Sequence, residues 1–222
     1  MEVKIHEELR GILRVGLLTV TGMQPPEDGG EALFESILAT AERLKKQHQG
    51  LTVGQIPGTQ ETRKLYRAIG IDPTKNRPSS EALLRRIIKG KSLYRIHPLV
   101  DIFNLVSLSY QLSVGLYDES KIRGSQIAVR KGEPGWGFDG IRKNRVNVAG
   151  RLCVVDEEGP FGSPTSDSLR TSIEGNVDRA LAVFFQHTDG EKDRLRQAVD
   201  KAAELCQHHL QASLEPTSVV EN

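Results

Sequence analysis

The sequence predicts an α+β fold in which a helical N-terminal half packs on a mixed β-sheet region, with an amphipathic helix at the C-terminus. Two observations lead to this prediction. Residues 31–112 carry apolar side chains mainly at helical spacing, whereas after Tyr117 glycine becomes frequent and the β-prone runs are short. Helical periodicity then returns once, near the C-terminus. Helices followed by strands and a last helix are typical of α+β folds, not of a regular βαβ array.

The N-terminal half is predicted to contain one strand and four helices. Residues 14–21 alternate in polarity and are rich in β-prone side chains, which indicates the strand. The spacing of apolar residues predicts helices at 31–48, 59–69, 79–90 and 98–112. Thr59 and Ser79 are the predicted N-caps of the second and third helices, and a glycine lies at or just past the end of each of the first three.

The C-terminal half is predicted to contain short strands joined by turns. The β-prone runs lie at 126–130, 146–148, 152–155 and 180–185. A helix is expected at 191–210, and periodicity is lost after Leu214. We therefore expect an N-terminal strand and helix in residues 1–58, an α+β domain in residues 59–212 that forms one globule with them, and a frayed tail in residues 213–222.

Composition excludes several classes of protein. Of 222 residues, 37% are hydrophobic and 27% are charged, which is typical of globular domains. No apolar run approaches the ~18 residues that a membrane span needs, so we expect no membrane partner. The charged N-terminus lacks the apolar core of a signal peptide, which favours a cytoplasmic location. Cys153 and Cys206 do not form a CxxC pair and are expected to be buried, reduced thiols.

Cofactor and metal patterns are weak in this sequence. Residues 135–140 match GxGxxG, but Pro134 precedes them and no amphipathic helix follows, so tight turns around Trp136 are expected in place of a nucleotide site. The six histidines do not show the spacing of metal ligands. We therefore predict no cofactor and no metal.

The predicted helix at 98–112 carries a stripe of polar residues on an otherwise apolar surface. Asp101, Asn104, Ser107 and Gln111 are spaced three, three and four residues apart, which places them on one face. Buried polar groups need partners. The stripe therefore either satisfies neighbouring backbone or lines a pocket. His97 directly precedes this helix, and capping is its expected role.

Charge is distributed unevenly along the chain. Residues 61–95 contain ten Lys or Arg and three acidic residues, a net charge of +7, whereas residues 156–222 carry −7. This pattern fits a surface that faces nucleic acid, but ordinary solvated helix faces would give the same pattern. The candidate phosphate-binding residues are Lys75, Arg77, Arg85, Arg86 and Lys89.

A loop at 159–171 is dense in small hydroxyl residues. Ser166, Asp167 and Thr171 could bind a ligand there, or the segment could be a polar surface loop. Composition alone leaves both interpretations open.

Three motifs follow one another in the middle of the chain: VDIFNLV at 100–106, LYDESKIRG at 116–124 and IAVRKGEP at 127–134. In order and spacing they resemble the tRNA-editing module of the phenylalanyl-tRNA synthetase beta subunit. The similarity extends from about residue 66 to residue 185. A synthetase core does not fit beside it in 222 residues, so the chain is similar to a free-standing relative of that module, not to a complete synthetase.

The resemblance implies a ligand pocket between the 98–112 helix and the serine-rich loop. Asn104, Asp118 and Thr171 are the candidates for catalysis. The candidates for substrate binding are Asp101, Ser107, Tyr117, Arg130, Ser166 and Asp167.

Some positions depart from the family pattern. Phe103 stands where many members have Thr, and Gly115 stands where they have His. The acidic residue that follows the loop in the family has no clear counterpart near Val177. Specificity for tyrosine is therefore in doubt, and another aminoacyl group or another ligand stays open.

Three functions are consistent with these features. The first is an aminoacyl-tRNA deacylase that hydrolyses mischarged tRNA in trans, as a part of translation quality control. The second is a non-catalytic module that binds tRNA or a small ligand. The third is an amino-acid-sensing domain that needs no RNA. The expected partners are tRNA and an amino-acid or aminoacyl ligand, and the sequence does not fix the oligomeric state.

Overall fold

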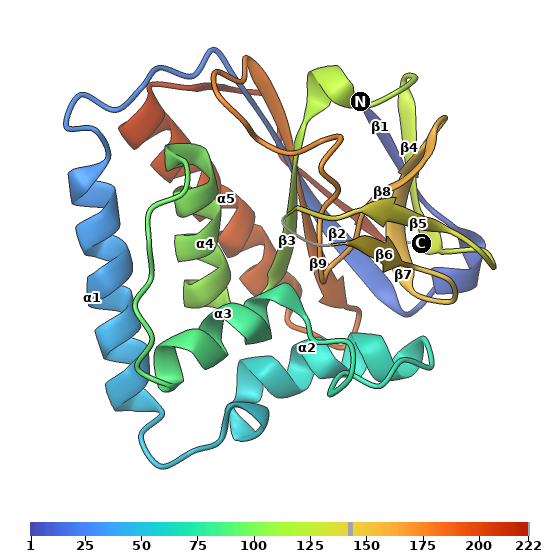
Figure 1. Cartoon of the computed structure of the whole chain (residues 1–222), viewed down its shortest axis with the longest axis horizontal. Helices are drawn as coiled ribbons and strands as arrows, with labels where there is room; N and C mark the ends of the chain where they lie inside the picture. The colour runs from blue at the N-terminus through green and yellow to red at the C-terminus, as the bar shows by residue number, and fades with distance from the viewer. Residues whose placement is uncertain (142–143, 222) are drawn as a thin grey trace.

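The structure, a computed structural model, describes residues 1–141 and 144–221 and has the predicted α+β fold. A layer of helices, a central sheet and a second sheet lie side by side (Figure 1). The helices are α1 (Glu31–Gln47), α2 (Pro57–Ala68), α3 (Ser79–Ile88), α4 (Pro98–Tyr110) and α5 (Lys192–Leu210). In the described part of the chain, no helix is both long and apolar enough to cross a membrane.

The strands form two main sheets and a small hairpin. The central sheet contains β2 (Leu13–Thr21), β3 (Ser113–Asp118), β9 (Arg179–His187), β10 (Ser213–Leu214) and β11 (Ser218–Glu221). The second sheet contains β1 (Glu2–Ile5), β4 (Gln126–Lys131), β7 (Leu152–Asp156) and β8 (Gly159–Gly162). The hairpin consists of β5 (Gly137–Asp139) and β6 (Arg145–Asn147). β9 lies in the middle of the central sheet, antiparallel to β2 and β3.

Strand β9 is buried on both faces. Ala182 and Phe184 point to the helical layer, while Leu181, Val183 and Phe185 point to the second sheet. Because successive side chains of a strand alternate between faces, a strand between two layers must be apolar throughout. The run at 179–187 meets this requirement, so β9 connects two hydrophobic cores.

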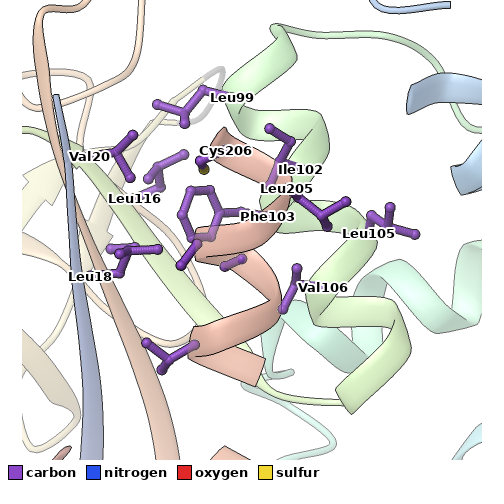
Figure 2. Packing of buried hydrophobic residues seen from close by; sticks show 14 of the residues in the cluster. Leu18, Val20, Leu99, Ile102, Phe103, Leu105, Val106, Leu116, Leu205 and Cys206 are labelled. Carbon is purple, nitrogen blue, oxygen red and sulfur yellow. The ribbon is translucent and has the colours of Figure 1, made fainter. Parts of the chain in front are cut away.

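The helical layer packs closely on the central sheet. Figure 2 shows Phe103 and Ile102 of α4 among Leu18 of β2, Leu116 of β3 and Cys206 of α5. The ring of Phe103 lies 5.9 Å from the ring of Phe184.

Strand β2 meets α5 at a glycine. A Cβ atom at Gly16 would lie 2.6 Å from Cγ2 of Val199, so only glycine allows this approach of helix and strand.

The helix starts differ in part from the sequence prediction. His97 caps α4 as expected, because its Nδ1 accepts the N–H of Leu99 at 3.2 Å. Thr59 and Ser79 are not N-caps, since α2 begins at Pro57 and α3 at Ser79, after Ile56 and Pro78. Pro57 lies in the first turn of α2, a position that suits proline, whereas Pro78 directly precedes α3 and makes no side-chain cap hydrogen bond.

Two further differences concern the chain ends. β1, which was not expected, pairs in parallel with β4. The expectation of a frayed tail does not hold for residues 213–221, because β10 and β11 both pair with β2. The guanidinium of Arg14 fixes β11: its Nε donates to Oε2 of Glu221 at 2.8 Å and its Nη2 to Oε1 at 3.1 Å. A long-range ion pair of this kind leaves no periodic signal in the sequence.

The two-sided core makes a prediction for matched leucines. Leu18 of β2 is completely buried, whereas Leu38 of α1 is 43% exposed. Leu18→Ala should lower the free energy of unfolding by about 2–5 kcal/mol, because it leaves a cavity between sheet and helices. Leu38→Ala should change it by about 0.5 kcal/mol or less. Urea unfolding of both variants measures the difference, and equal effects of the two changes would contradict this core.

The pairing of β11 makes a pH prediction. The hydrogen bond from Arg14 holds the pKa of Glu221 below its ordinary value of 4.5. A carboxyl group whose pKa is lower in the folded state stabilises the fold above its ordinary pKa, and this contribution disappears as the pH falls through the folded value. Glu221→Gln should therefore lower Tm at pH 7, and the gap to the wild type should narrow as the pH is lowered below 4.5. A gap that is independent of pH would contradict this role.

Candidate functional site

A cavity of about 820 Å³ lies between helices α3 and α4, strand β3 and the loop at 163–175. Its walls are mostly apolar, with Leu83, Val100, Phe103, Leu116 and Ile173 among them. A smaller chamber of about 120 Å³ adjoins it and shares the lining residues Leu83, Arg86, Tyr94, Ile96 and Asn104. A concave, mainly apolar space with a few polar groups is the usual form of a ligand site.

The polar stripe of α4 is divided between support and cavity. Both carboxylate oxygens of Asp101 accept the N–H of Ile96, at 3.3 and 3.4 Å, which fixes the segment before the helix. Burial raises the pKa of Asp101. Ser107 lines the cavity but donates to the carbonyl of Leu112 at 2.8 Å. Asn104 lines both the cavity and the chamber, so its amide is the group of the stripe best placed to meet a ligand.

The serine-rich loop is held mainly by its own hydroxyl groups. Oγ of Ser163 accepts the N–H of Ser166 at 3.0 Å and donates to its carbonyl at 2.9 Å. Thr171 is completely buried, with its hydroxyl 3.1 Å from that of Ser168. Its carbonyl accepts the N–H of Asp118 at 2.9 Å, which ties the loop to β3. Ser166 and Thr171 are therefore placed to shape the loop, while Asp167 lines the cavity.

Tyr117 of β3 is completely buried and packs in the hydrophobic cluster between the central sheet and the second sheet. Its ring stacks edge-on against Phe161, with 4.9 Å between centroids. Gly115 and Gly162 flank its hydroxyl: a Cβ atom would lie 1.9 Å from that oxygen at Gly115 and 2.2 Å at Gly162. Gly115 stands where the resembling family has His, and here the phenol of Tyr117 fills the space that a side chain would need. Burial and the charge of Asp167 raise the pKa of Tyr117 well above its ordinary value.

Two predicted site residues have local partners outside the cavity lining. Asp118 caps a short turn at Glu119–Lys121, where its Oδ1 accepts from the N–H and the hydroxyl of Ser120 at 3.1 and 2.6 Å. Arg130 of β4 pairs with Glu133 at 2.8 Å and lies over the ring of Trp136. Neither residue is among those that line the cavity.

The structure divides the basic segment at 61–95 into inward and outward charges. Arg63 and Arg77 both pair with Glu81, which is 1% exposed. Arg86 lines the cavity and lies 4.8 Å from the ring centroid of Tyr94. Of the five predicted phosphate-binding residues, Lys75 and Lys89 are exposed and Arg85 is partly exposed.

Sequence reasoning missed the rim of the cavity. Tyr94, Ile96, Ile141 and Leu169 are each at least 40% exposed and all line the cavity. Their signal was present in the sequence: large apolar residues in loops, outside any helical or strand period. Exposed apolar groups collected in one place mark a binding surface.

The residues described here contain no cluster of three His, Cys, Asp or Glu side chains that could hold a metal ion. The segment that matches GxGxxG contains the β5 strand of a hairpin, so no helix start is available there for a phosphate. Cys153 and Cys206 are buried and not bonded to each other, and burial raises the pKa of each thiol to about 12.

Comparison with protein families finds a match to the B3/4 domain. The model of the B3/4 domain matches residues 61–210, which is about two-thirds of the chain. The matched region contains α3, α4, β3 and the serine-rich loop, and thus most of the cavity. A comparison with curated proteins finds no match.

The packing of Tyr117 predicts a coupling between neighbouring positions. Gly115→Ala would place a methyl group against the phenol and should destabilise the fold by about 1–3 kcal/mol. Tyr117→Phe removes the nearest atom, so the double variant should be more stable than the sum of the two single changes. Urea unfolding of the three variants measures this coupling. Simple additivity would show that the two side chains do not compete for one space.

Proposed function

The chain belongs to the B3/4 domain family, and on that premise we propose that it binds the aminoacylated end of tRNA and hydrolyses the ester of mischarged tRNA. The B3/4 domain is found in the editing region of the phenylalanyl-tRNA synthetase beta subunit. The observation that carries the proposal is the cavity of about 820 Å³ within the matched region. A space of this volume exceeds the size of a single amino acid and suits an amino acid joined to a nucleoside.

The chemistry that the cavity supports needs few groups. An aminoacyl ester is already activated, so hydrolysis requires an oriented water molecule and stabilisation of the oxyanion. The amide of Asn104 can donate to the developing oxyanion and accept from the water. Asp118 and Thr171 act as positioning residues in this proposal, because the hydrogen bond from the N–H of Asp118 to the carbonyl of Thr171 fixes the loop against β3.

A second function is a module that binds the same ligand without hydrolysing it. The specific observation in its favour is that Asp118 and Thr171, two of the three residues predicted to act in catalysis, do not line the cavity. Both functions use one cavity, and a rate measurement separates them.

Asn104 provides the first test. Mischarged tRNAs that together cover the twenty aminoacyl classes are incubated with the protein, and hydrolysis of the ester is followed. Under the deacylase proposal at least one class is hydrolysed, and Asn104→Ala lowers that rate by roughly 10²-fold with little change in tRNA affinity. Asn76→Ala, in a loop outside the cavity lining, is the control and should leave the rate unchanged. Hydrolysis of no class by the wild type rejects the deacylase and leaves the binding module.

The outward charges of α3 provide the second test. If Arg85 and Lys89 bind phosphates, the logarithm of tRNA affinity should fall linearly with the logarithm of salt concentration. Arg85→Ala with Lys89→Ala should flatten that slope by about 0.7–0.9 for each phosphate that the protein no longer neutralises. Lys192→Ala with Arg196→Ala removes the same charge at the same spacing from α5 and should leave the slope unchanged. Equal effects of the two pairs would indicate a general charge effect, not a binding surface on α3.

A further inference from the structure

An exposed aromatic ring stands at the edge of the cavity in a fixed position. Tyr94 lies between α3 and α4, is 54% exposed, and lines both the cavity and the adjoining chamber. The chain on each side of it is hydrogen-bonded to a helix. The carbonyl of Ser92 accepts from Nε of Arg86 in α3 at 2.8 Å, and the N–H of Ile96 donates to the carboxylate of Asp101 in α4 at 3.3 Å. Tyr94 is therefore held in place although it is not part of the core.

One face of this ring has a cationic partner. The guanidinium carbon of Arg86 lies 4.8 Å from the ring centroid of Tyr94, which is within the range of a cation–π interaction. The residue nevertheless keeps more than half of its surface exposed, so the second face of the ring is open. A ring that is fixed on one face and open on the other provides a flat surface on which a planar group can stack.

The charges around the ring favour a ligand that is both planar and anionic. From residue 82 to residue 100 the chain has five Lys or Arg and no Asp or Glu, and Arg95, next to the ring, is exposed. The acids of the cavity lining, Asp167 and Glu174, both belong to the loop at 163–175. An apolar peptide would use the ring but not the positive charges. A nucleotide uses both, because it carries a planar base and a phosphate.

We propose that Tyr94, supported by Arg86, is a stacking platform for a nucleobase, and that it binds the base of the nucleoside that carries the aminoacyl group. The inference rests on the proposed function and deepens it, because it assigns the nucleoside end of the ligand to the α3–α4 side of the cavity. Every base has a π face, so stacking selects a nucleoside without reading its sequence. The platform thus distinguishes an aminoacyl nucleoside from a free amino acid.

The test compares two stable probes that contain no phosphate, so phosphate contacts do not contribute to the difference between them. One probe is 3′-amino-3′-deoxyadenosine that carries leucine through an amide, and the other is the same compound with hydrogen in place of adenine. Calorimetry with the wild-type protein should show an affinity about 10- to 100-fold lower for the probe without the base, which is the typical contribution of one stacked base.

Three variants assign this loss to one ring. Tyr94→Ala should bind the adenine probe about 10- to 100-fold more weakly than the wild type and the probe without the base equally well, so that the two affinities converge. Tyr94→Phe keeps the π face and should retain the wild-type difference. Leu169→Ala, the matched control, removes another exposed apolar side chain of the lining and should also retain the difference. A full wild-type difference in Tyr94→Ala would overturn the assignment.

The outcomes also separate this inference from the proposed function. Equal affinity of the wild type for the two probes, or binding of aminoacyl-tRNA without binding of either probe, would overturn the platform and leave tRNA editing or binding intact. Failure to bind both probes, together with failure to bind or hydrolyse aminoacyl-tRNA, would overturn both.

Discussion

The burial of β9 on both faces is the constraint on which the rest of the structure depends. Its side chains alternate between the helical layer and the second sheet, so neither layer can be removed without exposing half of the strand. β2 is also buried on both faces, and Gly16 allows α5 to pack closely on it. Helix α4 covers this sheet with Phe103 and Ile102, and Phe103 and Asn104 of the same helix also line the cavity.

Close packing also determines which residues can stand beside Tyr117. β3 pairs with β9 and places Tyr117 completely inside the protein, with its hydroxyl between two glycines. Because the phenol occupies that position, Gly115 cannot carry a side chain without a clash. The glycine at position 115 therefore follows from the packing of Tyr117.

Membership of the B3/4 domain family and the cavity support the same function from different directions. The family match covers most of the elements that build the cavity, and the cavity has the volume and the mixed polarity of a ligand site. The charged side chains of the basic segment at 61–95 have different surroundings. Arg86 faces the cavity, whereas Arg63 and Arg77 neutralise the buried Glu81, so a net charge of +7 overstates what remains for phosphates.

The sequence by itself determined the fold class, the helices and five of the eleven strands in the described residues, because apolar periodicity reports directly which face of an element is buried. It also determined the polar stripe of α4 and the cap at His97, since both follow from local spacing. Only the tertiary structure decided that Asn104 and Asp167 share a cavity while Thr171, Asp118 and Arg130 do not line it. It alone placed β11 on β2 through Arg14 and Glu221. Contacts between residues far apart in the chain depend on how layers pack, and no local pattern records them.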